Sequence, residues 1–141
     1  MYHFIGIKGA GMSALAVIMK QLGYQVQGSD VDKHYFTEAE LIKNNINFMP
    51  YDESNINGNL TIIKGLSITD ENPELIKAKS LNLEIINYNE MVGKLTKQLK
   101  TICICGCHGK TTTTAMTAHV LDKLKGINYL IGDGTGYAKK E

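Results

Sequence analysis

Residues 2–13 read Tyr-His-Phe-Ile-Gly-Ile-Lys-Gly-Ala-Gly-Met-Ser, a short apolar run that leads directly into a glycine-rich turn. The run at 2–7 predicts a buried parallel strand. After the turn, apolar residues recur with the spacing of a helix, at Leu15, Ile18, Met19 and Leu22. Gly23 predicts the end of that helix. A strand, a glycine turn and a helix in this order begin a βαβ unit.

The same alternation continues along the chain. Further strands are expected at 25–28, 60–63 and 84–86. The expected helices are 38–45, with Leu41 and Ile42 facing inward, a helix opened by Asn72-Pro73-Glu74, and 89–99. Strands that alternate with helices predict an α/β fold with a parallel sheet and right-handed crossovers.

Length and composition limit the class of protein. The 141 residues are enough for one domain, or for one small domain and part of another. A hydrophobic content of 43% and a charged content of 21% are typical of a soluble globular protein. The net charge of +1 gives no reason to expect nucleic acid or a membrane surface as a partner. With no long apolar stretch and no signal peptide, we expect a cytoplasmic location.

A second strand–glycine–helix opening follows a polar stretch at 96–101. We therefore expect two units, a Rossmann-like domain at 1–98 and the beginning of a P-loop α/β domain at 99–141. The second unit is expected to contain a strand at 101–105, a helix through Ala115 to Leu124 and a strand at 127–131.

The second opening has the arrangement of a P-loop. Backbone N–H groups and the helix dipole at such a turn favour a phosphate group. Lys110 supplies a cation for the β- and γ-phosphates, and the hydroxyl of Thr111 or Thr112 suits Mg²⁺. Ile104 stands where the common pattern has glycine, so the loop is a shorter variant. The predicted ATP site is Gly106, Cys107, His108, Gly109, Lys110, Thr111 and Thr112.

The first opening predicts a second phosphate site less specifically. Its three glycines suit a diphosphate at the helix N-terminus, but Lys8 occupies the middle glycine position of the Rossmann pattern. Asp30 follows the second strand, about 20 residues on, where an acidic residue meets ribose hydroxyls. On this motif alone, NAD, another nucleotide and a purely structural turn remain open.

Three cysteines lie close together at 103, 105 and 107. Their odd number is poor for disulfides, and a metal site lacks a distant partner pair. We expect small side chains packed in a strand and its following loop.

Taken together, the two openings identify a family. The chain resembles the Mur ligases at 4–13, at Gly28-Ser29-Asp30, at Asn72-Pro73-Glu74 and at 106–114. The resemblance runs through essentially the whole chain and covers about the first third of a full-length ligase. Gly11-Met12-Ser13 and the histidine before Gly-Lys-Thr favour the member that uses UDP-N-acetylmuramate and L-alanine.

The resemblance implies ATP-dependent amide formation in peptidoglycan precursor synthesis. ATP would phosphorylate the carboxylate of UDP-N-acetylmuramate, and the amine of L-alanine would displace the phosphate. Lys110 would be the catalytic residue that stabilises the transferring phosphoryl group, and Thr111 would hold Mg²⁺. The implied UDP-sugar site comprises Gly9, Ala10, Gly11, Met12, Ser13, Ser29 and Asp30.

The chain departs from the family pattern at several positions. Lys8 replaces a frequent glycine and either adds a cation near the diphosphate or points to solvent. Cys105 and Cys107 stand where threonine is frequent, and Tyr88 where arginine is frequent. The family's acidic metal ligands and its last domain would lie beyond residue 141. We therefore expect the chain alone to bind the UDP-sugar but to be inactive as a ligase; the alternatives are a regulatory nucleotide-binding module and an NAD-binding domain.

Overall fold

A computed structural model describes residues 1–138 and contains a five-stranded parallel sheet. Its strands are β1 (Tyr2–Ile5), β2 (Val26–Asp30), β3 (Asn47–Pro50), β4 (Thr61–Lys64) and β5 (Ile85–Asn87). They lie in the order β3-β2-β1-β4-β5. The chain first winds outward from β1 to β3, then crosses the sheet to β4 and winds to the other edge. The carboxyl ends of β1 and β4 are therefore the switch point at which such sheets bind ligands.

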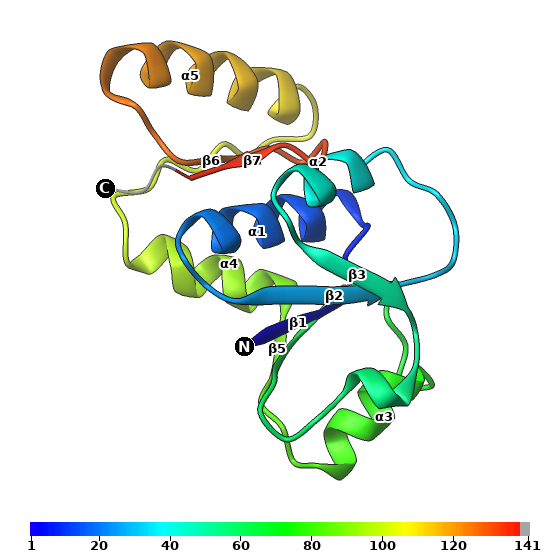
Figure 1. The fold of residues 1–141 in the computed structure, drawn as a ribbon. Coiled ribbons are helices and arrows are strands. Elements are labelled where there is room, and N and C mark those ends of the chain that lie inside the picture. The colour runs from blue at the N-terminus through cyan, green and yellow to red at the C-terminus, as the bar shows by residue number, and fades with distance from the viewer. Residues whose placement is uncertain (139–141) are drawn as a thin grey trace.

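Helices cover both faces of this sheet (Figure 1). Three of them lie on one face, namely α1 (Ala10–Gln21), α2 (Glu38–Lys43) and α4 (Tyr88–Lys97), while α3 (Pro73–Ser80) covers the other. Successive strand residues point to opposite faces. Phe4 and Ile63 accordingly belong to the core under α1, and Ile5 and Ile62 to the smaller core under α3. A short 3-10 helix, η1 (Glu53–Asn55), lies on the crossing between β3 and β4.

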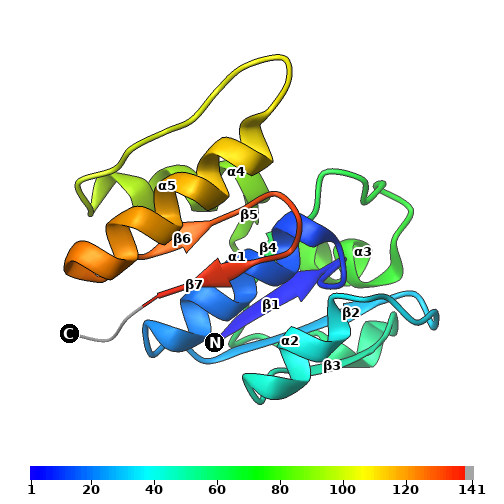
Figure 2. The same ribbon diagram turned by 90° about the horizontal axis from the view of Figure 1, so that it is seen from above.

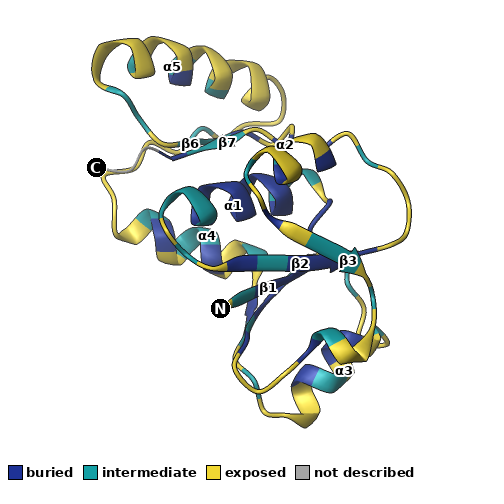
Figure 3. Ribbon diagram, viewed as in Figure 1, coloured by how far each residue is buried: buried dark blue, intermediate teal, exposed yellow. Residues whose placement is uncertain are grey.

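The last described segments pack outside this layer of helices. An antiparallel hairpin of β6 (Tyr129–Leu130) and β7 (Gly136–Tyr137) lies along α1 (Figure 2). The Ala138 N–H donates to Oε1 of Gln21 at 2.6 Å. Helix α5 (Lys110–Lys125) lies beyond the hairpin and is largely exposed (Figure 3), with Ala118 its one buried residue.

The predicted fold class is confirmed, and most elements lie within a few residues of their expected positions. Gly23 follows the last turn of α1, and Asn72 caps α3 by accepting the N–H groups of Glu74 and Leu75 at 3.0 and 3.2 Å. Within residues 1–138, no helix combines the length and the apolar character needed to cross a membrane.

Three local predictions are wrong, and one strand was missed. The segment at 101–105 is irregular rather than a strand, and Cys103, Cys105 and Cys107 are exposed rather than packed. A buried strand needs a hydrogen-bonded neighbour, and no strand in the described part of the chain pairs with this segment. Ile42 is 63% exposed because α2 turns only one narrow stripe, including Leu41, toward the core. Strand β3 was not predicted; it is a short edge strand that ends in Pro50 and lacks an apolar run.

Candidate functional site

Two adjoining hollows lie at the carboxyl edge of the sheet. The larger, of about 430 Å³, is called here the Asp30 hollow and is lined by Asp30, Val31, Tyr35, Tyr51, Ser67, Ile68, Thr69, Glu71 and Asn72. The smaller, of about 240 Å³, is called the glycine hollow and is lined by Gly6, Gly9, Ala10, Gly11, Met12, Gly65, Leu66, Ser67 and Tyr88. Ser67 lines both. Because all five strands are parallel, the segments that follow them meet at this edge.

The glycine turn directs backbone donors into the glycine hollow. Gly6 has a φ of 87°, a left-handed conformation that favours glycine, and its N–H donates to the Ser29 carbonyl at 2.8 Å. The first three N–H groups of α1, those of Ala10, Gly11 and Met12, have no hydrogen-bond partner within residues 1–138. These donors and the positive end of the helix dipole suit an anion.

Ser13 was predicted to join these donors, but it lies outside the hollow. Its N–H donates to the Gly9 carbonyl at 2.8 Å, and its hydroxyl donates to the Ala10 carbonyl at 3.0 Å. The side chain is fully buried inside the first turn of α1. Of the residues predicted along the glycine turn, the structure therefore brings Gly9, Ala10, Gly11 and Met12 to the hollow.

Asp30 ties the glycine turn to the end of β2. Its carboxylate accepts the N–H groups of Lys8 at 2.7 Å and Val31 at 2.8 Å, and the Tyr51 hydroxyl lies 3.4 Å from Oδ1. Burial, followed by the charge of Asp30, raises the pKa of Tyr51, so this phenol remains a protonated donor at neutral pH. Asp30 and Tyr51 together form one wall of the Asp30 hollow.

Neither role expected for Lys8 agrees with its position. Its ammonium donates to the carbonyls of Val31 and Lys33 at 3.1 and 2.8 Å and lies 2.8 Å from the Glu38 carboxylate. The side chain is 8% exposed, so it points neither to solvent nor into a hollow. The hydrogen bond from Lys8 outweighs the opposing effect of burial and lowers the pKa of Glu38. Lys8 is thus a structural link between the glycine turn and the segment after β2.

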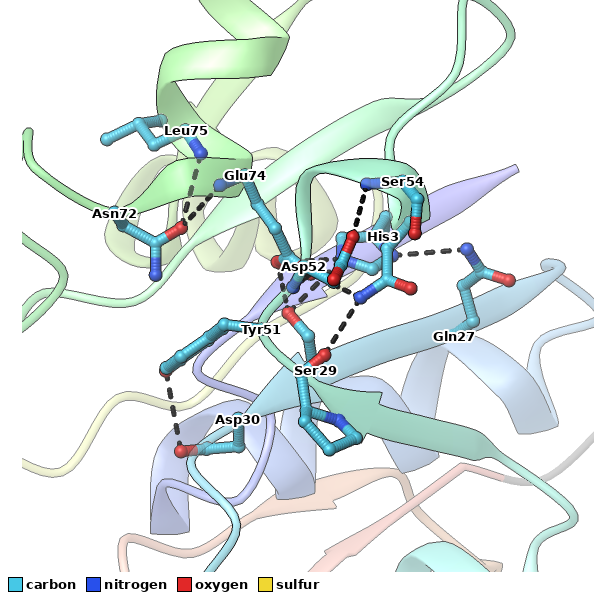
Figure 4. A network of polar contacts seen from close by, with 12 residues as sticks. His3, Gln27, Ser29, Asp30, Tyr51, Asp52, Ser54, Asn72, Glu74 and Leu75 are labelled. Atoms are coloured by element: carbon cyan, nitrogen blue, oxygen red, sulfur yellow. Dashed lines mark hydrogen bonds and ion pairs between the residues drawn. The ribbon is translucent and has the colours of Figure 1, made fainter.

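A buried polar network joins β1, β2 and the start of α3 (Figure 4). At its centre is the Glu74 carboxylate, which accepts the Ser29 hydroxyl, the Asn55 amide at 2.7 Å and the Asp52 N–H at 3.3 Å. His3 Nε2 lies 3.2 Å from the same carboxylate. Burial alone would raise the pKa of Glu74, but the hydrogen bonds from His3, Ser29 and Asn55 outweigh it and hold that pKa below its usual value.

Ser29 belongs to this network rather than to the surface. It is fully buried, and its hydroxyl donates to Glu74. The structure therefore separates the two residues predicted to meet a nucleoside, because Asp30 lines the hollow and Ser29 is buried against Glu74.

The predicted P-loop forms a turn that opens α5. Gly109 is the N-cap residue with a φ of 73°, which explains glycine at this position. The Lys110 ammonium donates to the carbonyls of Gly106 at 2.7 Å and Cys107 at 3.3 Å. Every residue from 106 to 112 is exposed. Figure 1 shows this end of α5 on the same side of the molecule as the carboxyl ends of the strands.

A metal site is not assembled in the described part of the chain. No group of three or more His, Cys, Asp or Glu side chains suited to a metal occurs among residues 1–138. The Mg²⁺ role of the Thr111 hydroxyl therefore remains a prediction.

Sequence reasoning assigned no binding role to the aromatic and hydroxyl side chains of the hollows, Tyr35, Tyr51, Ser67, Thr69 and Tyr88. Each follows the carboxyl end of a strand, which is a recognisable signal once the strands are known. For Tyr51 this signal could not be read from the sequence, because the strand before it, β3, was not predicted.

Comparisons with known proteins agree with this geometry. Residues 1–100 match the family described as "Mur ligase family, catalytic domain". The chain is 47% identical to UDP-N-acetylmuramate–L-alanine ligases of Pediococcus pentosaceus and of Lactiplantibacillus plantarum, over 96% of this chain and 31% of each relative. It therefore spans about a third of the length of the curated relatives it matches.

Solved structures of ligases also superpose on this chain. The UDP-N-acetylmuramate-alanine ligase of Thermotoga maritima superposes with a TM-score of 0.86 at 33% identity, over 98% of this chain and 34% of that one. The UDP-N-acetylmuramate:L-alanyl-gamma-D-glutamyl-meso-diaminopimelate ligase of Neisseria meningitides gives a TM-score of 0.83 at 25% identity, over 93% and 42% of the two chains.

Proposed function

This chain belongs to the Mur ligase family, and from that membership we propose that it carries the UDP-N-acetylmuramate site and the ATP P-loop of a ligase. The reaction joins L-alanine to UDP-N-acetylmuramate at the expense of ATP, in the synthesis of peptidoglycan precursors. The relatives at 47% identity are named for this substrate pair, which favours it over the peptide-adding ligases at 25% identity. We also propose a cytoplasmic location.

The observation that carries the proposal is the pair of hollows joined at Ser67. The free N–H groups of Ala10, Gly11 and Met12 suit the diphosphate in the glycine hollow. The Asp30 hollow, with Asp30 and Tyr51 in its wall, suits the uridine. Both lie at the switch point of the sheet, where ligands of this fold bind.

The P-loop would bind ATP and promote the phosphoryl transfer of the proposed reaction. In the proposed reaction the substrate carboxylate attacks the γ-phosphorus of ATP, and an acyl phosphate and ADP form. The amine of L-alanine then attacks the acyl carbon, and inorganic phosphate leaves. Lys110 is the catalytic residue, because its ammonium stabilises the charge on the transferring phosphoryl group. The backbone of 106–112 holds the phosphates of ATP.

A magnesium ion would be held with the help of the Thr111 hydroxyl, which is exposed on the first turn of α5. One hydroxyl is not a metal site, and no cluster of acidic or histidine side chains accompanies it within residues 1–138. We also propose the division into a UDP-sugar domain at 1–98 and an ATP-binding unit from 99 onward, although the hairpin of the second unit packs on α1.

Calorimetric titration of the chain with UDP-N-acetylmuramate, UDP, NAD and ATP tests the proposal. We expect UDP-N-acetylmuramate and UDP to bind and NAD to give no heat. Binding of NAD without any response to UDP would overturn the proposal in favour of a dinucleotide-binding domain.

A further inference from the structure

The phenol of Tyr88 lies over the first turn of α1. Its hydroxyl oxygen is 2.8 Å, and its Cζ 2.9 Å, from the place that a Cβ would occupy on Gly11. Tyr88 directly follows β5, so it reaches the glycine hollow from the side opposite the glycine turn. A side chain at position 11 would therefore displace this ring from its place over α1.

The described residues offer the Tyr88 hydroxyl no hydrogen-bond partner. It makes no hydrogen bond to any atom of residues 1–138, although the ring is half-buried and packs against the core. Burial raises the pKa of this phenol, so it stays protonated at neutral pH and is available as a donor. A half-buried hydroxyl of this kind is free to donate a hydrogen bond to a ligand in the hollow.

The walls of the glycine hollow are otherwise poor in polar side chains. Glycines, Ala10, Met12 and Leu66 form most of its lining, and Ser67 and Tyr88 contribute the two hydroxyls. The N–H groups of the first turn of α1 point into the same space. The Tyr88 hydroxyl therefore extends a row of backbone donors with a side-chain donor that carries no charge.

We propose that Tyr88 is a substrate-binding residue whose hydroxyl donates a hydrogen bond to the diphosphate of the nucleotide. The proposal rests on the function proposed above and adds a specificity determinant to that site. Hydrogen bonds to phosphate oxygens are charge-assisted and stronger than neutral ones. The contact favours nucleoside diphosphates over the nucleoside, because uridine carries no phosphate oxygen to accept this hydrogen bond.

The test is Tyr88→Phe, which removes one oxygen and keeps the ring that packs on the core. Tyr24→Phe is the matched control, since Tyr24 packs edge-on against Tyr2 at the amino end of β1, far from the hollows. Titration of the wild type and both variants with UDP and with uridine is compared with their thermal unfolding. We expect Tyr88→Phe to bind UDP about tenfold more weakly, with uridine affinity and melting temperature unchanged.

The outcomes separate this inference from the function on which it rests. If the wild type binds UDP and Tyr88→Phe binds it equally well, the hydroxyl has no role and only this inference fails. An equal loss of uridine and UDP affinity in Tyr88→Phe also overturns it, because the ring would then act on the whole site. If the folded wild type binds no UDP, both the proposed function and this inference are wrong.

Discussion

His3 Nε2 lies 3.2 Å from the Glu74 carboxylate, although the two residues are 71 positions apart in the chain. Both side chains are fully buried. His3 is on β1 and Glu74 is in the first turn of α3, so the contact joins the centre of the sheet to the helix on its second face. The Gln27 amide nitrogen is 3.1 Å from the other ring nitrogen of His3 and orients the ring.

Glu74→Gln should lower the free energy of unfolding at neutral pH by about 3 kcal/mol, because donors arranged around a buried carboxylate lose their charged acceptor. The loss should depend on pH. The pKa of Glu74 is lowered in the folded protein, so its contribution is present above the unfolded value of about 4.3 and is lost as pH falls through the folded value. The difference between wild type and variant should therefore shrink in acid. Urea unfolding at pH 7 and at acid pH measures it.

Glu53→Gln is the control for Glu74→Gln, because Glu53 is exposed in η1. It should change stability by less than about 0.5 kcal/mol at either pH. A Glu74→Gln protein as stable as this control would show that the buried network contributes nothing to folding.

Lys8→Met should destabilise the protein, because the Glu38 carboxylate and the carbonyls of Val31 and Lys33 lose their shared donor. Lys43→Met is the comparison, since the pair of Lys43 with Glu40 is exposed and should be worth less than about 1 kcal/mol. Thermal unfolding of both variants measures the difference. A Lys8→Met midpoint no lower than that of Lys43→Met would contradict the structural role.

Gly136→Ala should loosen the hairpin from α1. A Cβ at this position would lie 2.4 Å from the Ala14 carbonyl oxygen, whereas at Gly132 nothing lies within 4 Å. Overpacking of this kind costs about 1–3 kcal/mol. Hydrogen exchange should show faster exchange of the Ala138 amide, which donates to Gln21, in Gly136→Ala but not in Gly132→Ala. Equal protection in the two variants would mean that the hairpin does not depend on this contact.

Lys110→Met should abolish ATP binding and leave the affinity for UDP unchanged. Lys110 is exposed, and among residues 1–138 it donates only to the carbonyls of its own loop, so its loss should not disturb the sheet. Titration with each nucleotide separates the two sites. A parallel loss of UDP affinity would show that the ATP site and the UDP site are not separate, contrary to the proposal.

The local elements could be predicted because their signals are local. The Asn72-Pro73-Glu74 start of α3 and the Gly109-Lys110 start of α5 depend on backbone geometry within a few residues. The strand at 101–105 could not be excluded in the same way. Its apolar residues suit a strand, but a strand exists only where another one pairs with it.

The sequence by itself determined two glycine turns that each open a helix, since free N–H groups and left-handed glycines are properties of short segments. Only the tertiary structure decided that Lys8 and Ser29 turn away from the hollows, and that Tyr51 and Tyr88 face them. Those outcomes depend on which strands are neighbours and on which edge their carboxyl ends meet. Contacts between residues far apart in the chain follow from the order β3-β2-β1-β4-β5, and no short stretch of sequence encodes that order.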